Sequence, residues 1–469
     1  MIWDLKKYSD NTAVITENGE NITYSRFFEM TQKLAIQVGR RCLVMCFCKN
    51  EMGSLLGYIS FLNNNIVPIM VSNELEQSAV YRLLDVYRPD FLWVPDDKIS
   101  AYGFETVYSD AGYSLLKTGN CGVYALYDEL ALLLTTSGST GSPKFVRQSY
   151  KNIIANTNSI VEYLELDETE RAITTLPMNY TYGLSIINTH LYAGAAVILT
   201  EKTIMQREFW QQFKENKATS FGGVPYIYEM LDKLRFFGMD LPYLRTMTQA
   251  GGKLSPELHK KFAEYAQKNG RHFVVMYGQT EATARMAYLP HEKALEKYGS
   301  MGIAIPGGKF YLIDVNGNEI TEPEVTGELV YEGENVTLGY AVCGEDLCKG
   351  DEWHGRNVTG DMAKRDKDGF YYITGRKKRF LKIFGSRVNL DETERMVKAA
   401  FPETDCACGG VDDKMYVFVT AKNHEAGIKK FLSEKMSLNP SAFEIKHIEK
   451  IPRSESGKVL YKELDKYYG

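Results

Sequence analysis

The chain has 469 residues, of which 44% are hydrophobic and 25% charged, and its formal net charge is −5 at pH 7. This length predicts two or three cooperating units rather than one simple core. The weakly acidic balance excludes a general attraction to nucleic acid or to an anionic membrane, although local basic patches remain compatible with it.

The N-terminal residues 1–7 lack the apolar segment of an export signal, and no run of 18 apolar residues predicts a membrane span. We therefore expect a cytoplasmic protein. Eight cysteines are too few for a disulfide scaffold in a chain of this length, and no histidine pair stands near them at zinc-finger spacing. We expect reduced, buried or half-buried thiols without a metal at the three closest pairs: Cys46 and Cys48, Cys343 and Cys348, Cys406 and Cys408.

Residues 12–140 alternate short apolar runs with helical patterns. Residues 42–47 and 66–70 have the composition of buried strands, and residues 55–62 between them have that of a helix. This alternation predicts βα units and a largely parallel sheet, so the expected fold class is α/β.

The segment 135–144 follows the apolar run 130–134 and gathers hydroxyl side chains, two glycines and Lys144. Backbone N–H groups, short hydroxyls and one lysine can converge on an anion, so the segment resembles a phosphate loop. It is not a Walker loop, because no Gly-Lys-Ser/Thr follows Gly138 at the required offset and Pro143 precedes the lysine. Composition alone would favour an ordinary surface turn.

Several later turns follow strand-like segments. The turn at 176–183 crowds aromatic and small residues, and glycine pairs lie in 218–225 and 249–254. The strand-like residues 273–277 run into a polar turn ending at Glu281. Turns at the carboxyl ends of strands are where α/β sheets usually hold ligands, and Glu281 offers oxygen to Mg²⁺. The alternatives are tyrosines that pack a loop and a glutamate that is merely solvated.

From Gly299 onward, short strands alternate with Gly, Pro and Asn turns, which predicts a β-rich subdomain. The basic cluster 376–379 then marks either a solvated face or a linker. The last ninety or so residues combine strand-like 415–419 with helix-like 428–436, which predicts a small α+β unit.

Six motifs in this order resemble the adenylate-forming superfamily, which includes acyl-CoA synthetases, adenylation domains of peptide synthetases and firefly luciferase. The resemblance extends from Thr23 to Lys458. The motifs are the loop ending in Pro143-Lys144, Tyr277-Gly278-Gln279-Thr280-Glu281, Gly327-Glu328-Leu329 with Gly339-Tyr340, Thr359-Gly360-Asp361, Gly375-Arg376 leading to Gly385, and Pro452-Arg453 with Ser456-Gly457-Lys458.

The resemblance implies a large N-terminal domain, residues 1–377, with a β-rich subdomain at 299–377. It also implies a hinge at Lys378 and a mobile C-terminal lid, residues 379–469. Such an enzyme first joins a carboxylate to the α-phosphate of ATP, which gives an acyl-adenylate and pyrophosphate, and a thiol then displaces AMP. Cations and oriented N–H donors must offset the repulsion between two anions in the first step.

The resemblance also assigns roles to residues. Lys458, Thr280 and Glu281 are the expected catalytic residues, with Glu281 on Mg²⁺ and Lys458 bridging carboxylate and phosphate. Tyr277 is expected against the adenine, and Asp361, helped by Arg376, at the ribose. The expected nucleotide-binding residues are Thr136, Ser137, Gly138, Ser139, Thr140, Gly141, Lys144, Gly251, Gly252, Tyr277, Gly278, Gln279, Thr280, Asp361 and Arg376.

The hinge and the acceptor face follow from the same resemblance. Rotation about Lys378 would withdraw Lys458 and present Gly385, Ser386 and Arg387 to a pantetheine thiol. Lys378 could instead belong to a solvated basic patch.

Departures from the family pattern bear on the substrate. Thr181 stands where amino-acid-activating relatives commonly have an aspartate, so an α-amino group would find no ion pair there. We therefore expect an acid without an α-amino group, in a pocket lined by Tyr180, Thr181, Tyr182, Gly251 and Gly252. Phe145 and Tyr150 replace a common glycine and a common histidine, which puts loop contacts after Lys144 in doubt.

The sequence therefore predicts an ATP- and Mg²⁺-dependent acid–thiol ligase for an aryl or fatty acid, with coenzyme A or the phosphopantetheine of a carrier protein as acceptor. The alternatives are an amino-acid adenylation enzyme that loads a carrier protein, a catalytically silent nucleotide-binding homologue, and an oxygenase of luciferase type.

Overall fold

The computed structural model describes residues 2–135, 144–377, 379–436, 438–454 and 457–468. The chain divides into two compact units, Met1–Phe310 with Tyr331–Asn357 and Tyr311–Val330 with Val358–Gly469. The predicted hinge, Lys378, lies outside the described residues, so the domain boundary at that residue stays a prediction.

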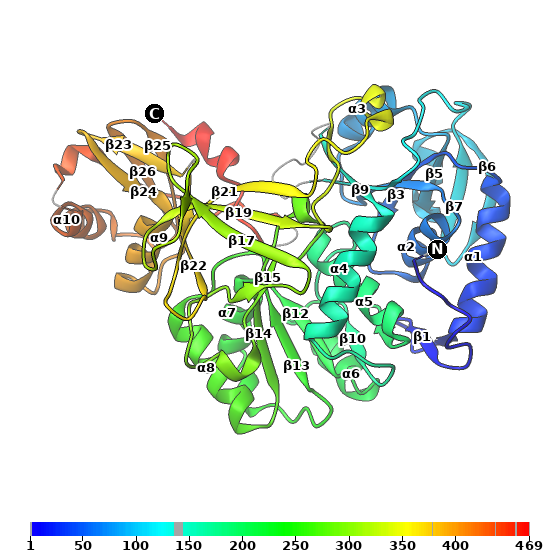
Figure 1. The fold of residues 1–469 in the computed structure, drawn as a ribbon, viewed down its shortest axis with the longest axis horizontal. Coiled ribbons are helices and arrows are strands. Elements are labelled where there is room, and N and C mark those ends of the chain that lie inside the picture. Colours follow the sequence, from blue (N-terminus) through cyan, green and yellow to red (C-terminus); the bar gives the residue numbers. More distant parts are fainter. Residues whose placement is uncertain (1, 136–143, 378, 437, 455–456, 469) are drawn as a thin grey trace. The chain divides into compact units, whose positions relative to one another are not determined.

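The first unit contains an eight-stranded mixed sheet in the order β20-β9-β8-β4-β3-β5-β7-β6. Figure 1 labels β3, β5, β6, β7 and β9 of this sheet. Its centre is parallel, because β3 pairs in parallel with β4 and β5, and β4 with β8. The strands are β3 (Leu43–Cys48), β4 (Val67–Ser72), β5 (Phe91–Pro95), β6 (Glu105–Asp110), β7 (Tyr113–Lys117), β8 (Leu130–Thr135), β9 (Phe145–Ser149) and β20 (Gly339–Ala341).

The parallel pairing expected from residues 12–140 forms this centre, and antiparallel strands extend the sheet at its edges. Strand β7 is antiparallel to β5 and β6, and β9 is antiparallel to β8. The physical reason is that β6–β7 and β8–β9 are joined by short connections, and antiparallel strands need no helical crossover.

The second sheet of this unit has nine strands in the order β16-β15-β14-β13-β12-β10-β11-β1-β2. Strands β1 and β10 to β14 pair in parallel, whereas β2, β15 and β16 are antiparallel additions at the edges. The bounds are β1 (Thr12–Ile15), β2 (Asn21–Thr23), β10 (Arg171–Ile173), β11 (Ala196–Ile198), β12 (Ser220–Gly223), β13 (Thr246–Gln249), β14 (His272–Tyr277), β15 (Ala287–Tyr288) and β16 (Ile303–Ala304).

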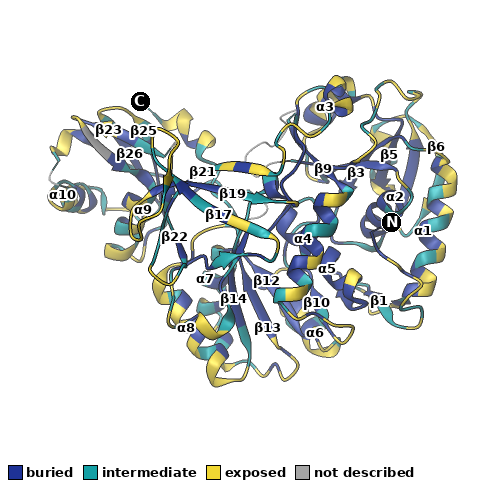
Figure 2. Cartoon of the chain, in the orientation of Figure 1, coloured by how far each residue is buried: buried dark blue, intermediate teal, exposed yellow. Residues whose placement is uncertain are grey.

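One hydrophobic core joins the two sheets of the first unit. It contains side chains from β1 and β3 together with residues of α1, α2 and α5, and α2 is buried around nearly its whole circumference (Figure 2). Helix α5 is likewise buried on nearly all sides, whereas α1 and α6 have the single buried stripe of a surface helix. The helices are α1 (Tyr24–Val38), α2 (Met52–Asn63), α3 (Gln77–Tyr87), α4 (Tyr150–Tyr163), α5 (Thr181–Ala193), α6 (Arg207–Glu215), α7 (Pro225–Lys233) and α8 (Pro256–Lys268).

A five-stranded sheet, in the order β18-β17-β19-β21-β22, forms the predicted β-rich region. Strands β21 and β22 are antiparallel, and Gly369 in the turn between them has a φ of 88°. That value explains the glycine, because other residues seldom adopt it. The strands are β17 (Gly308–Ile313), β18 (Glu319–Ile320), β19 (Gly327–Gly333), β21 (Arg356–Arg365) and β22 (Tyr371–Arg376).

The C-terminal part of the second unit is the predicted small α+β fold. A three-stranded sheet β25-β26-β27 and the hairpin β23-β24 share a core with α9 and α10. The elements are β23 (Phe380–Ile383), β24 (Ser386–Asn389), α9 (Leu390–Ala400), β25 (Cys406–Val411), β26 (Lys414–Val419), α10 (Glu425–Met436) and β27 (Phe443–His447).

Five of the eight cysteines are buried, and Cys343 is half-buried. The expectation of buried or half-buried thiols is wrong for Cys348, which is exposed, as is Cys121. Cys121 lies in the segment between β7 and β8, and Cys348 is the last residue of the 3₁₀ helix Gly344–Cys348, so both lie outside the sheets. Among the described residues, no helix is long and apolar enough to cross a membrane.

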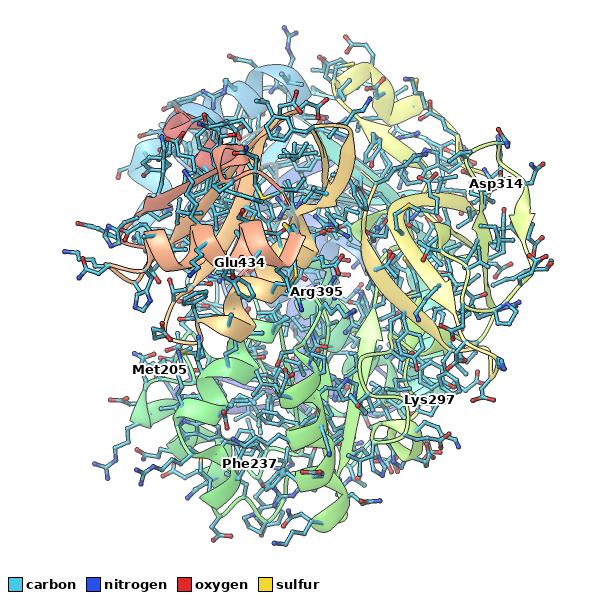
Figure 3. The ribbon with its side chains drawn as sticks, turned by 90° about the vertical axis from the view of Figure 1, so that its left-hand side faces the viewer. Met205, Phe237, Lys297, Asp314, Arg395 and Glu434 are labelled. Carbon is cyan, nitrogen blue, oxygen red and sulfur yellow. The ribbon has the colours of Figure 1, made fainter. Side chains whose placement is uncertain are left out.

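An aromatic cluster covers one side of the nine-stranded sheet near α7 and α8, and it includes Phe237, which Figure 3 labels. His259 on α8 packs edge-on against Phe273 in this region, with ring centroids 5.6 Å apart. Its Nδ1 accepts a hydrogen bond from the Gly299 N–H at 3.1 Å, so the ring fits there as a neutral group.

We expect His259 to destabilise the protein as the pH falls. Burial lowers the pKa of His259 to about 4, from an ordinary value of 6.5. A lowered folded-state pKa leaves stability intact above about pH 6.5 and removes up to about 3 kcal/mol as the pH falls toward 4. His259→Gln keeps an acceptor for Gly299 but cannot titrate. Calorimetric Tm against pH should therefore fall less steeply below pH 6.5 for this variant than for the wild type. An unchanged slope would contradict the assignment, and exposed His354→Gln is the control.

Candidate functional site

The parallel strands β12, β13 and β14 end at one edge of the nine-stranded sheet. Gly223 is in register with Gln249, and Gln249 with Val275, so the turns that follow these strands lie side by side. Gly251 in the second turn has a φ of 84°, which only glycine adopts easily. The second and third turns contain six of the residues that the sequence proposed for the site: Gly251, Gly252, Gly278, Gln279, Thr280 and Glu281.

The turn after β14 is fixed by close packing and by hydrogen bonds. A Cβ on Gly278 would lie 1.7 Å from the carbonyl oxygen of Ala284, so no larger residue fits. Gln279 Nε2 donates to the Tyr277 hydroxyl at 3.2 Å, and Asn357 Nδ2 donates to Gln279 Oε1 at 3.2 Å. Gln279 is thus held from both sides, which orients Tyr277 for the predicted adenine contact.

Thr280 and Glu281 lie in the short 3₁₀ turn Thr280–Ala282 directly after this segment. Thr280 is buried and Glu281 is half-buried. The Glu281 carbonyl accepts from the backbone N–H and the hydroxyl of Thr337, each at 3.0 Å. The backbone that carries the predicted Mg²⁺ ligand is therefore pinned to the segment before β20.

Two successive contacts through one tyrosine side chain connect Lys144, Tyr340 and Glu281. The Tyr340 hydroxyl donates to Glu281 Oε1 at 2.8 Å, and the Lys144 ammonium lies 3.4 Å from the centroid of the Tyr340 ring. A cation over a tyrosine face is attracted by the ring quadrupole. One ring thus links the lysine at the end of the predicted phosphate loop to the predicted metal ligand.

Two features explain how residues so distant in sequence meet. Strands β8 and β9 are antiparallel, so segment 136–143 connects two neighbouring strands of a sheet. Strand β20 pairs with β9, which places Tyr340 opposite Val146. The pKa of Tyr340 is raised by burial and then by the Glu281 charge, so the ring stays neutral and able to donate.

Glu281 fits a magnesium ion that substrate phosphates help to hold. The described residues contain no group of three or more His, Cys, Asp or Glu side chains that could enclose a metal. Mg²⁺ often takes only one or two protein carboxylates and completes its shell with phosphates and water. Glu281 Oε1 is oriented by Tyr340, and the carboxylate retains Oε2 for such an ion.

The predicted acyl-pocket tyrosines lie in a hydrophobic cluster beside the ends of β12 to β14. The rings of Tyr180 and Tyr182 pack edge to face with centroids 6.3 Å apart. The Tyr182 hydroxyl and Thr248 Oγ1 are 2.9 Å apart, which ties α5 to β13. The Thr181 hydroxyl donates to the Thr283 carbonyl, so it joins the start of α5 to the turn after Glu281. The pocket itself stays a prediction.

Asp361 and Arg376 lie in the second unit and face each other across the β21–β22 pair. They are register partners, and Arg376 Nε lies 3.5 Å from Asp361 Oδ1. The Asp361 side chain is largely buried, whereas that of Arg376 is exposed. The structure therefore brings together the two residues that the sequence assigned to the ribose.

Lys458 lies half-buried at the end of a tight turn in the second unit. Its N–H donates to Ser454 Oγ at 3.2 Å, and its carbonyl accepts from the Ser454 N–H at 2.8 Å. Arg453 fixes this turn through the Gly457 carbonyl at 3.0 Å and Asp405 Oδ2 at 2.7 Å. Burial alone would raise the pKa of Asp405, but Lys398 and Arg453 outweigh it and the pKa is lowered.

Other predicted residues are only partly described. Gly385 has a φ of 87° and lies with Phe384 in the turn of the β23–β24 hairpin. The side chains of Ser386 and Arg387 are not described. The phosphate-loop residues and the hinge lie outside the described residues: Thr136, Ser137, Gly138, Ser139, Thr140, Gly141 and Lys378.

Sequence reasoning missed two residues. Tyr340 was noted only as part of a motif, and its contact with Glu281 depends on the β9–β20 pairing. Arg285 was not noted, although it is the single charged residue between Glu281 and Leu289 and is 2% exposed. A lone cation in an otherwise uncharged stretch after a functional motif is the signal that could have identified it.

The fold and the site define a mixed α/β protein with glycine turns and a carboxylate after parallel strands, and with a lysine directly before β9 that contacts the ring bonded to this carboxylate. Residues 2–341 match the model of the AMP-binding enzyme family. The chain belongs to this family.

Two curated relatives and two solved structures illustrate the similarity. The chain is 29% identical to peroxisomal OPC-8:0-CoA ligase 1 of Arabidopsis thaliana, over 72% of this chain and 64% of the relative. It is 27% identical to sulfoacetate–CoA ligase of Cupriavidus necator, over 71% and 66%. The chain thus spans less than two thirds of the length of these relatives.

Among solved structures, o-succinylbenzoate CoA synthetase from Bacillus subtilis in complex with its acyl-adenylate superposes with a TM-score of 0.80 at 19% identity. The match covers 98% of this chain and 97% of that one. An anthranilate CoA ligase in complex with anthranoyl-AMP gives a TM-score of 0.79 at 19% identity, covering 99% and 96%. These matches confirm the α/β fold class.

Proposed function

We propose that this protein is an ATP-dependent carboxylic acid:thiol ligase. It activates an acid without an α-amino group as an acyl-adenylate with release of pyrophosphate, and then transfers the acyl group to a pantetheine thiol. ATP and Mg²⁺ are the cofactors, and coenzyme A is the favoured acceptor.

The observation that carries this proposal is the Lys144–Tyr340–Glu281 contact. Lys144 lies 3.4 Å from the Tyr340 ring centroid, and the Tyr340 hydroxyl lies 2.8 Å from Glu281 Oε1. A cation for the departing pyrophosphate and an anion for Mg²⁺ are thereby held near each other before substrate binds. Such preorganised charge is what phosphoryl chemistry asks of a protein, because the protein makes few covalent bonds itself.

The relatives support the type of acceptor. The two curated relatives described above are CoA ligases by name. A third relative, indoleacetate–CoA ligase of Aromatoleum aromaticum, is 28% identical to this chain. Their names include no carrier-protein loading, so we favour coenzyme A over a carrier protein. Their names refer to different acids, among them sulfoacetate and indoleacetate, so the acid of this protein has to be identified by experiment.

The absence of an aspartate at Thr181 supports an acid without an ammonium group. The Thr181 hydroxyl is neutral and donates to the Thr283 carbonyl. An α-ammonium placed beside it would lose its hydration without gaining an ion pair, which is costly in a buried site. This argues against the amino-acid adenylation alternative.

ATP–pyrophosphate exchange over a panel of aryl, fatty and amino acids tests the proposal. We expect exchange with at least one class of acid without an α-amino group and no exchange with amino acids. Exchange with amino acids alone would overturn the substrate class. Tight ATP binding with no exchange for any acid would establish the catalytically silent alternative. Thioester formation with coenzyme A, and then with a phosphopantetheinylated carrier protein, separates the acceptors.

A further inference from the structure

Arg285 is a buried cation in the aromatic cluster predicted to hold the acid, and no role in adenylation accounts for it. It is 2% exposed, and its guanidinium carbon lies 3.9 Å from the centroid of the Tyr182 ring. Its Nε contacts Met276 Sδ at 3.3 Å. Both neighbours belong to the cluster beside the ends of β12 to β14.

The backbone of Arg285 is held in place independently of its side chain. Its N–H donates to Asn156 Oδ1 at 3.2 Å, and its carbonyl accepts from Asn156 Nδ2 and Asn335 Nδ2, each at 2.9 Å. The main chain is therefore anchored by two buried asparagines. The direction of the guanidinium is then set by Tyr182 and Met276.

Two other arginines whose side chains are little exposed have carboxylate partners. Fully buried Arg147 pairs with Glu352, and Arg379 pairs with Asp391 and Glu394. Within the described residues, Arg285 forms no ion pair with a carboxylate. A buried guanidinium without a counter-ion is unfavourable, and a cation–π contact offsets only part of that cost.

The neighbouring tyrosines cannot supply the missing negative charge. Burial raises the pKa of Tyr180 and of Tyr182 to about 12, although the Arg285 charge opposes the shift. Burial likewise raises the pKa of Tyr163. The charge of Arg285 and the hydrogen bond between Arg285 and Tyr163 lower this pKa, but burial outweighs them. All three rings are therefore neutral near pH 7. A guanidinium has five N–H donors, more than Met276 and Tyr163 can satisfy.

We propose that Arg285 binds a second anionic group of the acid substrate, a carboxylate or sulfonate remote from the carboxylate that is adenylated. This inference rests on the proposed function and narrows its substrate class to dianionic acids. A guanidinium can hold such a group through two parallel hydrogen bonds, while Tyr182 shields the other face. The reacting carboxylate belongs elsewhere, because the contacts of Arg285 are with Tyr182, Met276 and Tyr163 rather than with Glu281 or Tyr340.

The test is ATP–pyrophosphate exchange with length-matched acids: butyrate and succinate, hexanoate and adipate, octanoate and suberate, p-toluate and terephthalate. For the best pair, we expect the full-length wild type to prefer the diacid about 30-fold in kcat/KM, as a charge-assisted hydrogen-bond pair implies. Arg285→Gln should reduce this ratio to about 1, and Arg285→Lys should leave an intermediate ratio because Lys cannot bond in two parallel contacts.

Arg271→Gln is the matched control, since Arg271 also stacks on a tyrosine, with its guanidinium carbon 5.2 Å from the Tyr265 ring centroid. This variant should keep the wild-type ratio. A wild type that prefers every monoacid, or an Arg285→Gln variant that keeps the diacid preference, would overturn the inference while leaving the ligase proposal intact. Absence of exchange with every acid would overturn the ligase proposal and this inference with it. If Arg285→Gln does not fold, the wild-type and Arg285→Lys ratios decide.

Discussion

Lys458→Ala should lower the rate of adenylation by about 10²- to 10⁴-fold, while thioester formation from a preformed acyl-adenylate stays within about threefold of the wild type. The reason is the charge distribution of the first half-reaction. A carboxylate attacks a phosphate, and a lysine that contacts both anions stabilises the transition state more than the separated ground state. The second half-reaction breaks the mixed anhydride with a neutral or thiolate nucleophile and does not need that bridge.

The local structure indicates that Lys458→Ala should leave the backbone of the surrounding turn unchanged. The turn that holds Lys458 is fixed by hydrogen bonds of the Lys458 backbone N–H and carbonyl with Ser454 and by the Arg453–Asp405 ion pair, all of which an alanine at position 458 can keep. The fold of this unit should therefore survive the change. ATP–pyrophosphate exchange measures the first half-reaction, and single-turnover mixing of acyl-adenylate with coenzyme A measures the second. Exposed Lys462→Ala is the matched control. Equal loss of both half-reactions would remove Lys458 from the adenylation step.

Much of the fold follows from local patterns. Apolar runs of four to six residues became buried strands, as in β3 and β8, and the helical stretch after β3 became α2. Strand direction did not follow. Strand β7 is buried over its first four residues, much as the parallel strands are, and its short connection to β6 makes it antiparallel. Periodicity describes how a strand is buried, whereas pairing direction depends on chain connections.

In the candidate site, too, some features follow from the local sequence and others depend on tertiary contacts. The family resemblance named Gly278 as a nucleotide-binding residue, and the structure adds that the Ala284 carbonyl leaves no room for a Cβ there. The contact of Tyr340 with Glu281 joins residues 59 positions apart in the chain and depends on β20 pairing with β9. The sequence could not show that Arg285 is buried without a carboxylate partner among the described residues, because its burial depends on tertiary packing. Sequence motifs name residue types for a chemistry, and tertiary contacts decide which of them meet.

Glu281→Gln should lower the exchange rate by about 10²- to 10³-fold at low Mg²⁺ and raise the Mg²⁺ concentration needed for half-maximal rate. The amide is isosteric and still accepts the hydrogen bond from the Tyr340 hydroxyl, which lies 2.8 Å from Glu281 Oε1. The substitution therefore removes the negative charge and leaves the packing unchanged.

Tyr340→Phe separates the orientation of the carboxylate from its charge. This variant keeps the ring beneath Lys144, whose ammonium lies 3.4 Å from the ring centroid, and removes only the hydroxyl that orients Glu281. Loss of one hydrogen bond to a charged group predicts a decrease of about 10-fold or more, smaller than that of Glu281→Gln. Exposed Glu334→Gln controls for the loss of one surface carboxylate. If Glu281→Gln has the Mg²⁺ dependence of the wild type, Glu281 does not bind the metal, and the Lys144–Tyr340–Glu281 contact then serves to hold β9, β20 and the turn after β14 together.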